Sequence, residues 1–256
     1  MLSRTLKPAA ALRRPITGIY ALLILANLAA WAWAALVFRA QPLLLGTALL
    51  AYGFGLRHAV DADHIAAIDN ATRKLMQHGK QPVAVGLFFA MGHSSVVILA
   101  AAGVAGTATA LTGSFDRFRA VSNVIGTGVS ASLLFAIAAA NLIVLRGVWR
   151  AFQHVRKGGS YLDEDFDLLL SSRGLLAPLF RPLFRLIGES WHMYPIGFLF
   201  GLGFDTATEV ALLAVAATAA AKGMSIWTIM VFPSLFAVGM SLMDTTDSIL
   251  MTRAYG

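Results

Sequence analysis

Long apolar stretches separated by short polar segments make up most of this chain. A helix that crosses the hydrocarbon core of a membrane needs roughly 20 apolar residues, and six stretches of the sequence reach that length. The pattern therefore predicts an all-α fold, a polytopic bundle of about six transmembrane helices. The predicted spans are Ile16–Phe38, Pro42–Asp69, Pro82–Ala108, Val121–Val148, Met193–Ala221 and Ser225–Met251.

Composition agrees with a membrane protein. Hydrophobic residues make up 58% of the 256 residues and charged residues only 13%, whereas a soluble domain has about 25% charged residues. No segment reads as a second, soluble domain, so we expect a single membrane domain over residues 1–256. The chain has no cysteine, which excludes disulfides, thiolate metal sites and cysteine nucleophiles.

The formal net charge of +7 is compatible with nucleic-acid binding, but the positions of the basic residues indicate membrane topology instead. Lysine and arginine concentrate in cytoplasmic loops. With a cytoplasmic N-terminus, 15 basic residues fall on the cytoplasmic side and 4 on the other side. We therefore expect both chain ends to be cytoplasmic and no nucleic-acid partner. The four outer residues are Arg39, Arg117, Arg119 and Lys222, and Arg57 lies within the second span.

The longest connection between the predicted spans is residues 150–190, on the cytoplasmic side. The acidic run Asp163–Asp167 most simply indicates a patch exposed to solvent. The alternative interpretation is a loop that concentrates metal ions near the protein. Beyond the acidic run, Leu175–Ile187 alternates apolar residues with Arg181 and Arg185. This pattern predicts a short helix that lies on the membrane lipid at the anionic cytoplasmic interface.

Ionisable residues inside the predicted spans are the most informative feature of the sequence. Such groups are costly in hydrocarbon and usually functional, and imidazole with carboxylate is a ligand set for divalent metals of intermediate softness. We therefore predict a buried site for a divalent cation; a buried ion-pair network is the alternative. The residues concerned are His58, Asp61, Asp63, His64, Asp69, His93, Asp205, Glu209, Asp244 and Asp247.

The second span holds the densest group of these residues. If its helix is continuous, His58, Asp61 and His64 fall within an arc of about 120° and line one face. Asp63 then points away from that face. It is a candidate to accept a hydrogen bond from a ligating imidazole and so to fix the orientation of that ring, without binding the metal itself. A bend would exchange the roles of the two acids. The second and fifth spans are long and carry polar groups, so we expect them to be broken or tilted.

The other spans add further candidate ligands. His93 lies among small residues of the third span and is a third imidazole candidate. In the fifth span, Asp205 and Glu209 are four residues apart and repel each other unless a proton or a cation intervenes. In the sixth, Asp244 and Asp247 are three residues apart. Helix capping is the alternative for both acidic pairs.

Four segments of the sequence resemble, in order, the conserved stretches of the nickel/cobalt transporter (NiCoT) family. The first contains the His-x4-Asp-His pattern of His58, Asp63 and His64. Two positions depart from the usual pattern, with Met91 in place of leucine and Ser248 in place of glycine. The matching segments are Arg57–Ile65, Phe88–Val97, Trp191–Leu212 and Gly239–Gly256.

The resemblance implies a permease that imports Ni²⁺ or Co²⁺ through the bacterial inner membrane, with the ion as cargo and no resident cofactor. Family members usually have eight spans, so we expect either a shortened chain or the absence of the last two helices. The resemblance assigns the metal to His58, Asp63, His64, His93, Asp205, Glu209, Asp244 and Asp247, and the helix-face argument adds Asp61.

Two other functions compete with import. Efflux relatives tend to carry a long histidine-rich loop, whereas the cytoplasmic loop and its end hold only His154 and His192, which favours import. A membrane metalloenzyme is less favoured, since no His-Glu-x-x-His is present. Without a phosphate-binding GxxxxGK[ST] motif, we expect no ATP hydrolysis and no need for an ATPase subunit. A division into three plus three spans predicts two halves of inverted topology, although the sequence shows no convincing residue-level similarity between the halves.

Overall fold

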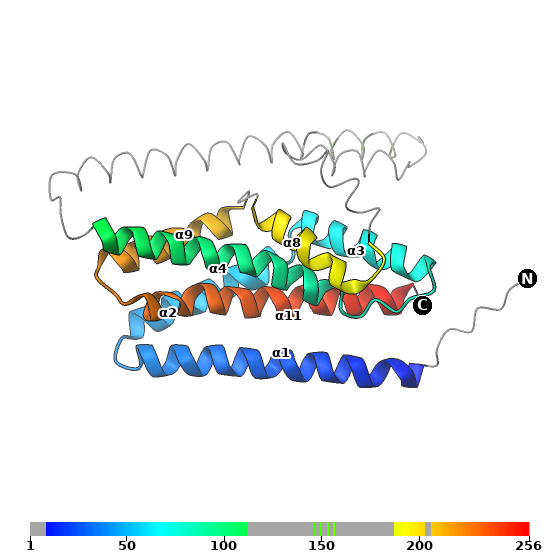
Figure 1. Cartoon of the computed structure of the whole chain (residues 1–256), viewed down its shortest axis with the longest axis horizontal. Coiled ribbons are helices and arrows are strands. Elements are labelled where there is room, and N and C mark those ends of the chain that lie inside the picture. Colours follow the sequence, from blue (N-terminus) through cyan, green and yellow to red (C-terminus); the bar gives the residue numbers. More distant parts are fainter. Residues whose placement is uncertain are drawn as a thin grey trace, which may run out of the picture.

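Helices form every element in the part of the chain that the computed structural model describes (Figure 1). It describes residues 9–111, 187–202 and 206–255, together with 146, 149, 153 and 156. The predicted all-α fold is therefore confirmed. The acidic run and Asp205 lie outside the described residues, as do nearly all of the predicted fourth span and of the proposed interfacial helix.

Three helices are long and apolar enough to cross a membrane. They lie within α1 (Ala9–Phe38), α4 (Val85–Leu111) and the pair α10 (Ile226–Ile229) and α11 (Val231–Ala254). The apolar stretches themselves are Arg14–Phe38, Val85–Gly106 and Ile226–Ala254. These helices correspond to the predicted first, third and sixth spans, as expected for a multi-pass membrane protein.

The second and fifth predicted spans are each broken into two helices, as their polar content predicts. The second consists of α2 (Pro42–His58) and α3 (Ala62–Gln77), which meet at an angle of 49°. If this pair counts as one span, the described residues hold four span candidates. The fifth consists of α8 (Met193–Gly201), preceded by the short η1 (Ser190–His192), and α9 (Ala207–Ala221). The second span is therefore not one continuous helix, and the prediction that His58, Asp61 and His64 line a single helix face is wrong.

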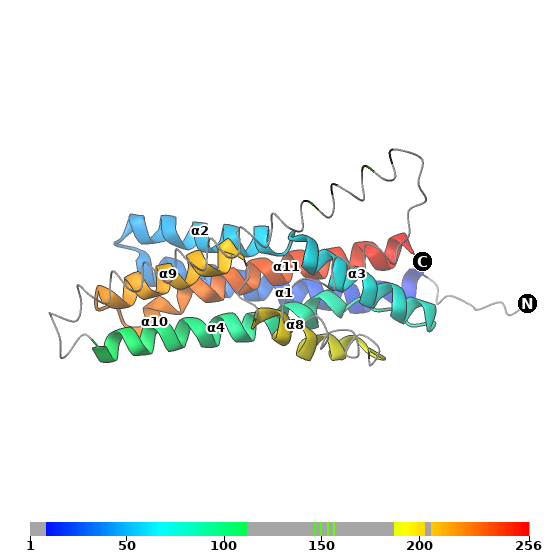
Figure 2. The same ribbon diagram turned by 90° about the horizontal axis from the view of Figure 1, so that it is seen from above.

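The described helices form two similar halves that run in opposite directions (Figures 1 and 2). Each half has a broken helix pair followed by a long helix: α2, α3 and α4 in the first, and α8, α9 and α11 in the second. The long helices α4 and α11 pack against each other, and each is covered by the broken pair of the other half, α8 on α4 and α2 on α11.

Glycines allow the backbones of α2 and α11 to touch. A Cβ atom added at Gly55 of α2 would collide with the carbonyl oxygen of Phe236 on α11. In the other direction, a Cβ atom at Gly239 of α11 would lie 2.9 Å from the carbonyl oxygen of Tyr52 on α2. Small residues at helix crossings are typical of membrane proteins, because close packing replaces the hydrophobic effect there.

The same contacts recur between α8 and α4, the equivalent pair of helices from the two halves. A Cβ atom at Gly197 of α8 would collide with the carbonyl oxygen of Phe89, and one at Gly92 of α4 would collide with that of Tyr194. Both halves thus use a Tyr-x-x-Gly segment on the broken pair and a Phe-Ala-x-Gly segment on the long helix. The repeat extends to residue level, a similarity that was not evident from the sequence alone, and its two halves run in opposite directions. The three-plus-three division itself is not tested, because nearly all of the predicted fourth span lies outside the described residues.

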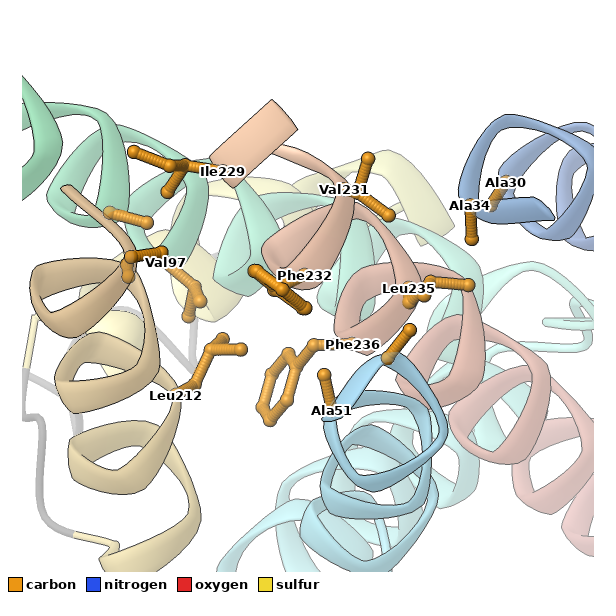
Figure 3. Close-up of a cluster of buried hydrophobic side chains, with 14 of the residues drawn as sticks. Ala30, Ala34, Ala51, Val97, Leu212, Ile229, Val231, Phe232, Leu235 and Phe236 are labelled. Atoms are coloured by element: carbon orange, nitrogen blue, oxygen red, sulfur yellow. The ribbon is translucent and has the colours of Figure 1, made fainter. Parts of the chain in front are cut away.

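Among the described residues, the largest apolar cluster lies where the halves meet. Phe232 and Phe236 of α11 pack there with Leu212 of α9 and Val97 of α4 (Figure 3). Much of the remaining cluster is alanine, which lets the helix axes approach closely. These contacts hold the two helix breaks against the long central helices and so position the polar side chains described next.

Candidate metal centre

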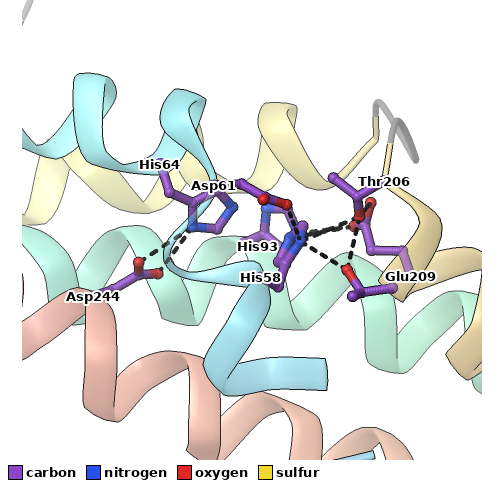
Figure 4. A network of polar contacts seen from close by, with 8 residues as sticks. His58, Asp61, His64, His93, Thr206, Glu209 and Asp244 are labelled. Atoms are coloured by element: carbon purple, nitrogen blue, oxygen red, sulfur yellow. Dashed lines mark hydrogen bonds and ion pairs between the residues drawn. The ribbon is translucent and has the colours of Figure 1, made fainter. Parts of the chain in front are cut away.

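Three buried imidazoles meet at the break between α2 and α3. His58 is the last residue of α2, His64 lies in the first turn of α3, and His93 lies in α4. Their exposed fractions are 1%, 0% and 2%. One nitrogen from each ring lies within 4.8 Å of the others, and the ring centroids are 4.5 to 4.9 Å apart. Figure 4 shows the three rings together.

The helix break is what brings His58 and His64 together. In an uninterrupted helix, residues six positions apart are separated by about 9 Å along the axis. Here α2 ends, the chain extends through Asp61, and α3 starts in a new direction, so the two ring centroids are 4.5 Å apart. The site therefore depends on the departure from helical geometry and not on one helix face.

Asp244 orients His64 from α11. Each of its carboxylate oxygens lies 3.2 Å from His64 Nδ1. A carboxylate only accepts hydrogen bonds, so His64 carries its proton on Nδ1 and donates it to Asp244. His64 Nε2 is buried and has no hydrogen-bond partner among the described residues. Its free lone pair is available for a metal, and carboxylate-oriented histidines of this kind are typical metal ligands.

Glu209 closes the opposite side of the cluster. It is fully buried in the first turn of α9, and its Oε1 lies 2.9 Å from His93 Nε2. The same His93 nitrogen lies 2.9 Å from His58 Nε2. The Nε2 atoms of these two rings therefore point toward each other, with the Glu209 carboxylate beside them (Figure 4).

Two threonines that are not among the predicted site residues complete the polar network. Thr206 Oγ1 lies 3.2 Å and Thr208 Oγ1 lies 3.3 Å from His58 Nδ1. Asp61, the N-cap of α3, approaches the same nitrogen at 3.7 Å. A signal was present in the sequence, because Thr206-x-x-Glu209 matches the pattern of a helix N-terminus.

Two phenylalanines form apolar walls around the imidazoles. The rings of Phe89 and His64 have centroids 4.9 Å apart, and those of Phe236 and His58 have centroids 5.4 Å apart. Both phenylalanines are fully buried and occupy equivalent positions in the two halves. They restrict the rotamers of the histidines and keep water away from the outer faces of the rings.

The other predicted site residues have separate surroundings. Asp63 lies half-buried in the first turn of α3, beside His64 in the chain. Asp247 lies one turn beyond Asp244 in α11, and its buried Oδ2 has no hydrogen-bond partner among the described residues. Asp69 pairs with Arg73 and accepts a hydrogen bond from Tyr255, which raises the pKa of Tyr255. The structure therefore does not bring Asp69 or Asp247 into the imidazole cluster.

The arrangement has the chemistry of a site for a divalent cation. Metal–nitrogen bonds of about 2.1 Å allow two ligand nitrogens to be at most about 4.2 Å apart, so the three rings need only a small contraction. If ionised, Glu209 and Asp244 together balance the charge of one dication. Imidazole suits nickel, cobalt, zinc and copper, and such metals are separated by geometry more than by intrinsic affinity.

The proteins that this chain resembles are named for nickel or cobalt, which are divalent metals of the same type. The family model described as "High-affinity nickel-transport protein" matches residues 44–256. A "High-affinity nickel transport protein" from Cupriavidus necator is 61% identical over 95% of this chain and 69% of its own length. "Hydrogenase nickel incorporation protein HupN" from Bradyrhizobium diazoefficiens is 53% identical over 91% of this chain and 61% of its own length.

A cobalt protein is among the relatives as well. "Cobalt transport protein NhlF" from Rhodococcus rhodochrous is 47% identical over 83% of this chain and 61% of its own length. The chain thus spans roughly two thirds of the length of the relatives it matches. No solved structure matches the chain. The family match and these identities show that the chain belongs to the NicO family of high-affinity nickel-transport proteins.

Proposed function

We propose that the whole protein imports Ni²⁺, Co²⁺ or both across the bacterial inner membrane, and that His58, His64 and His93 hold the ion on its way through. Glu209 and Asp244 border the site and balance the ion's charge. The N-terminus is cytoplasmic, and neither ATP hydrolysis nor a resident cofactor is required. The names of the relatives support this choice of ion and of transport.

The observation that carries the proposal is the buried group of three imidazoles. Neutral rings with free lone pairs replace the water that a dication loses on entering the membrane. Two carboxylates at opposite ends of the group supply negative charge, which lowers the cost of burying a dication. A purely structural cluster would not need His64 Nε2 to lie buried without a hydrogen-bond partner.

The membrane potential is a sufficient driving force for entry. Moving two positive charges through the full potential yields about 4.6 kcal/mol per 100 mV. That free energy corresponds to an accumulation ratio of roughly two thousand. A site that binds the ion and then releases it on the cytoplasmic side needs no further source of energy.

The decisive experiment measures radioactive nickel uptake by proteoliposomes that contain the full-length protein. We expect alanine at His58, His64 or His93 to reduce uptake to the level of empty liposomes. His78→Ala is the matched control, because His78 is exposed at the end of α3 and its ring hydrogen-bonds to the backbone oxygen of Lys74, away from the imidazole cluster. An inside-negative potential should increase uptake by the wild type.

Two outcomes contradict the proposal. Uptake that survives all three alanine substitutions rules out the imidazole cluster as the site of passage. Lower nickel content in cells that express the protein, compared with cells that do not, indicates export instead of import.

A further inference from the structure

Thr206 lies between two groups of the proposed cation site. Its Oγ1 is 3.2 Å from His58 Nδ1 and 3.0 Å from Glu209 Oε2 (Figure 4). We propose that Thr206 is a positioning residue: it fixes the proton of His58 on Nδ1 and thereby presents the lone pair of Nε2 to the cation. This inference rests on the proposed site and concerns how that site is prepared for the ion.

The proton count at Thr206 determines the direction of its hydrogen bonds. A threonine hydroxyl has one hydrogen and accepts with its lone pairs. Glu209, as a carboxylate, can only accept, so Thr206 donates its hydrogen to Glu209 Oε2. The contact with His58 then requires Nδ1 to be the donor. His58 Nε2 is left without a hydrogen.

The other side of the ring leads to the same tautomer. His93 Nε2 lies 2.9 Å from both Glu209 Oε1 and His58 Nε2. With Glu209 ionised, His93 Nε2 must carry the hydrogen, so His58 Nε2 must be an acceptor. The lone pair of His93 then lies on its Nδ1, which is buried and has no hydrogen-bond partner among the described residues. With Glu209 ionised, the contacts of Thr206 and those of His93 therefore both place the His58 lone pair on Nε2, facing the other imidazoles.

Thr206 is not explained by helix capping. Thr206 is the N-cap of α9, but its side chain makes no hydrogen bond to the backbone N–H groups in the first turn of that helix. Its hydroxyl bonds instead to His58, Glu209 and Thr208, the last at 3.1 Å. Asp61, the N-cap of α3 in the other half, approaches the same His58 nitrogen, so both helix breaks contribute to orienting this ring.

The test compares Thr206→Val, which keeps the shape but loses the hydroxyl, with Thr206→Ser, which keeps the hydroxyl. Co²⁺ is the probe, because its visible absorption reports ligand type and geometry. We expect Thr206→Val to weaken Co²⁺ binding by about 10- to 100-fold and to change the spectrum, and Thr206→Ser to restore both. Thr218→Val, in the same helix but with its hydroxyl on the backbone oxygen of Ala214, should resemble the wild type.

Wild-type affinity and spectrum in Thr206→Val would overturn the inference. So would a lower unfolding temperature with an unchanged spectrum, which indicates a structural role only. If Thr206→Val does not fold, Thr206→Ala is judged by the same criteria. The proposed site itself is tested separately by His64→Ala: wild-type Co²⁺ binding in that variant contradicts the site, whatever Thr206 does.

Discussion

At the scale of single residues, the site consists of imidazoles held by oxygen atoms from other helices. Asp244 accepts from His64, a residue 180 positions earlier in the chain, and Glu209 lies against His93 from another helix. The histidines could be predicted from the sequence, because an ionisable ring in an apolar span is rare. The acids could be predicted as candidates too, but which acid meets which histidine could not, because that pairing depends on how the helices pack.

Asp244 should matter for metal affinity although His64 supplies the ligand nitrogen. Asn in its place keeps an oxygen acceptor but loses the charge that orients the ring and balances the cation. We expect Asp244→Asn to weaken Ni²⁺ binding by about 10- to 100-fold, measured by equilibrium binding to purified protein. Glu189→Gln is the control, since Glu189 pairs with Lys80 on the surface. Equal affinities for the two variants would contradict this role.

Nickel binding should also depend on pH with a defined sign. Metal ligation uses a lone pair of the imidazole, and protonation of the ring removes it, so protons compete with the metal. We expect the dissociation constant for Ni²⁺ to rise when the pH is lowered from 7.5 to 5.5. The measurement is a binding titration at fixed ionic strength. An unchanged constant over this range would show that histidine nitrogens are not the ligands.

At the scale of helices, the two breaks produce the site. An unbroken second span would keep His58 and His64 a turn and a half apart, and an unbroken fifth span would not offer Thr206 and Glu209 at a helix start. The polar content of these spans predicted the breaks. Their positions followed only from the structure, because the chain leaves helical geometry where partners outside the helix satisfy its polar groups.

Close contact between helices should be as important as the ligands. A methyl group at Gly55 would collide with the backbone of Phe236, and overpacking of this kind costs about 1–3 kcal/mol. We therefore expect Gly55→Ala to lower the unfolding temperature and weaken Ni²⁺ binding. Gly53→Ala, two residues earlier in the same helix and with open space around it, should leave both unchanged. Thermal unfolding in detergent, with and without nickel, distinguishes these results.

At the scale of the whole molecule, two inverted halves enclose one site. The first half contributes three histidines and the second contributes Thr206, Glu209 and Asp244. The start of α1, the α3–α4 connection and the end of α11 lie at one end of the bundle (Figures 1 and 2). This agrees with the charge pattern, which assigns the same three segments to one side of the membrane.

The inversion predicts opposite sidedness for equivalent residues. His78 and Lys222 are the C-caps of α3 and α9, and each is followed by a glycine with positive φ, Gly79 and Gly223. Since the chain has no cysteine, His78→Cys and Lys222→Cys each provide a unique thiol. An impermeant maleimide should label His78→Cys only from the cytoplasmic side and Lys222→Cys only from the outer side. Labelling of both from one side would contradict the inverted arrangement.

The sequence by itself determined the membrane class, most of the helices and the residue types of the site. Hydrocarbon forces each segment to satisfy its own backbone, so apolar length alone specifies a helix, and ionisable groups within such a segment stand out. Tertiary structure alone decided which of these groups meet. Distances between side chains depend on where helices break and how closely they cross, and these are set by contacts such as Gly55 with Phe236, between residues far apart in the chain.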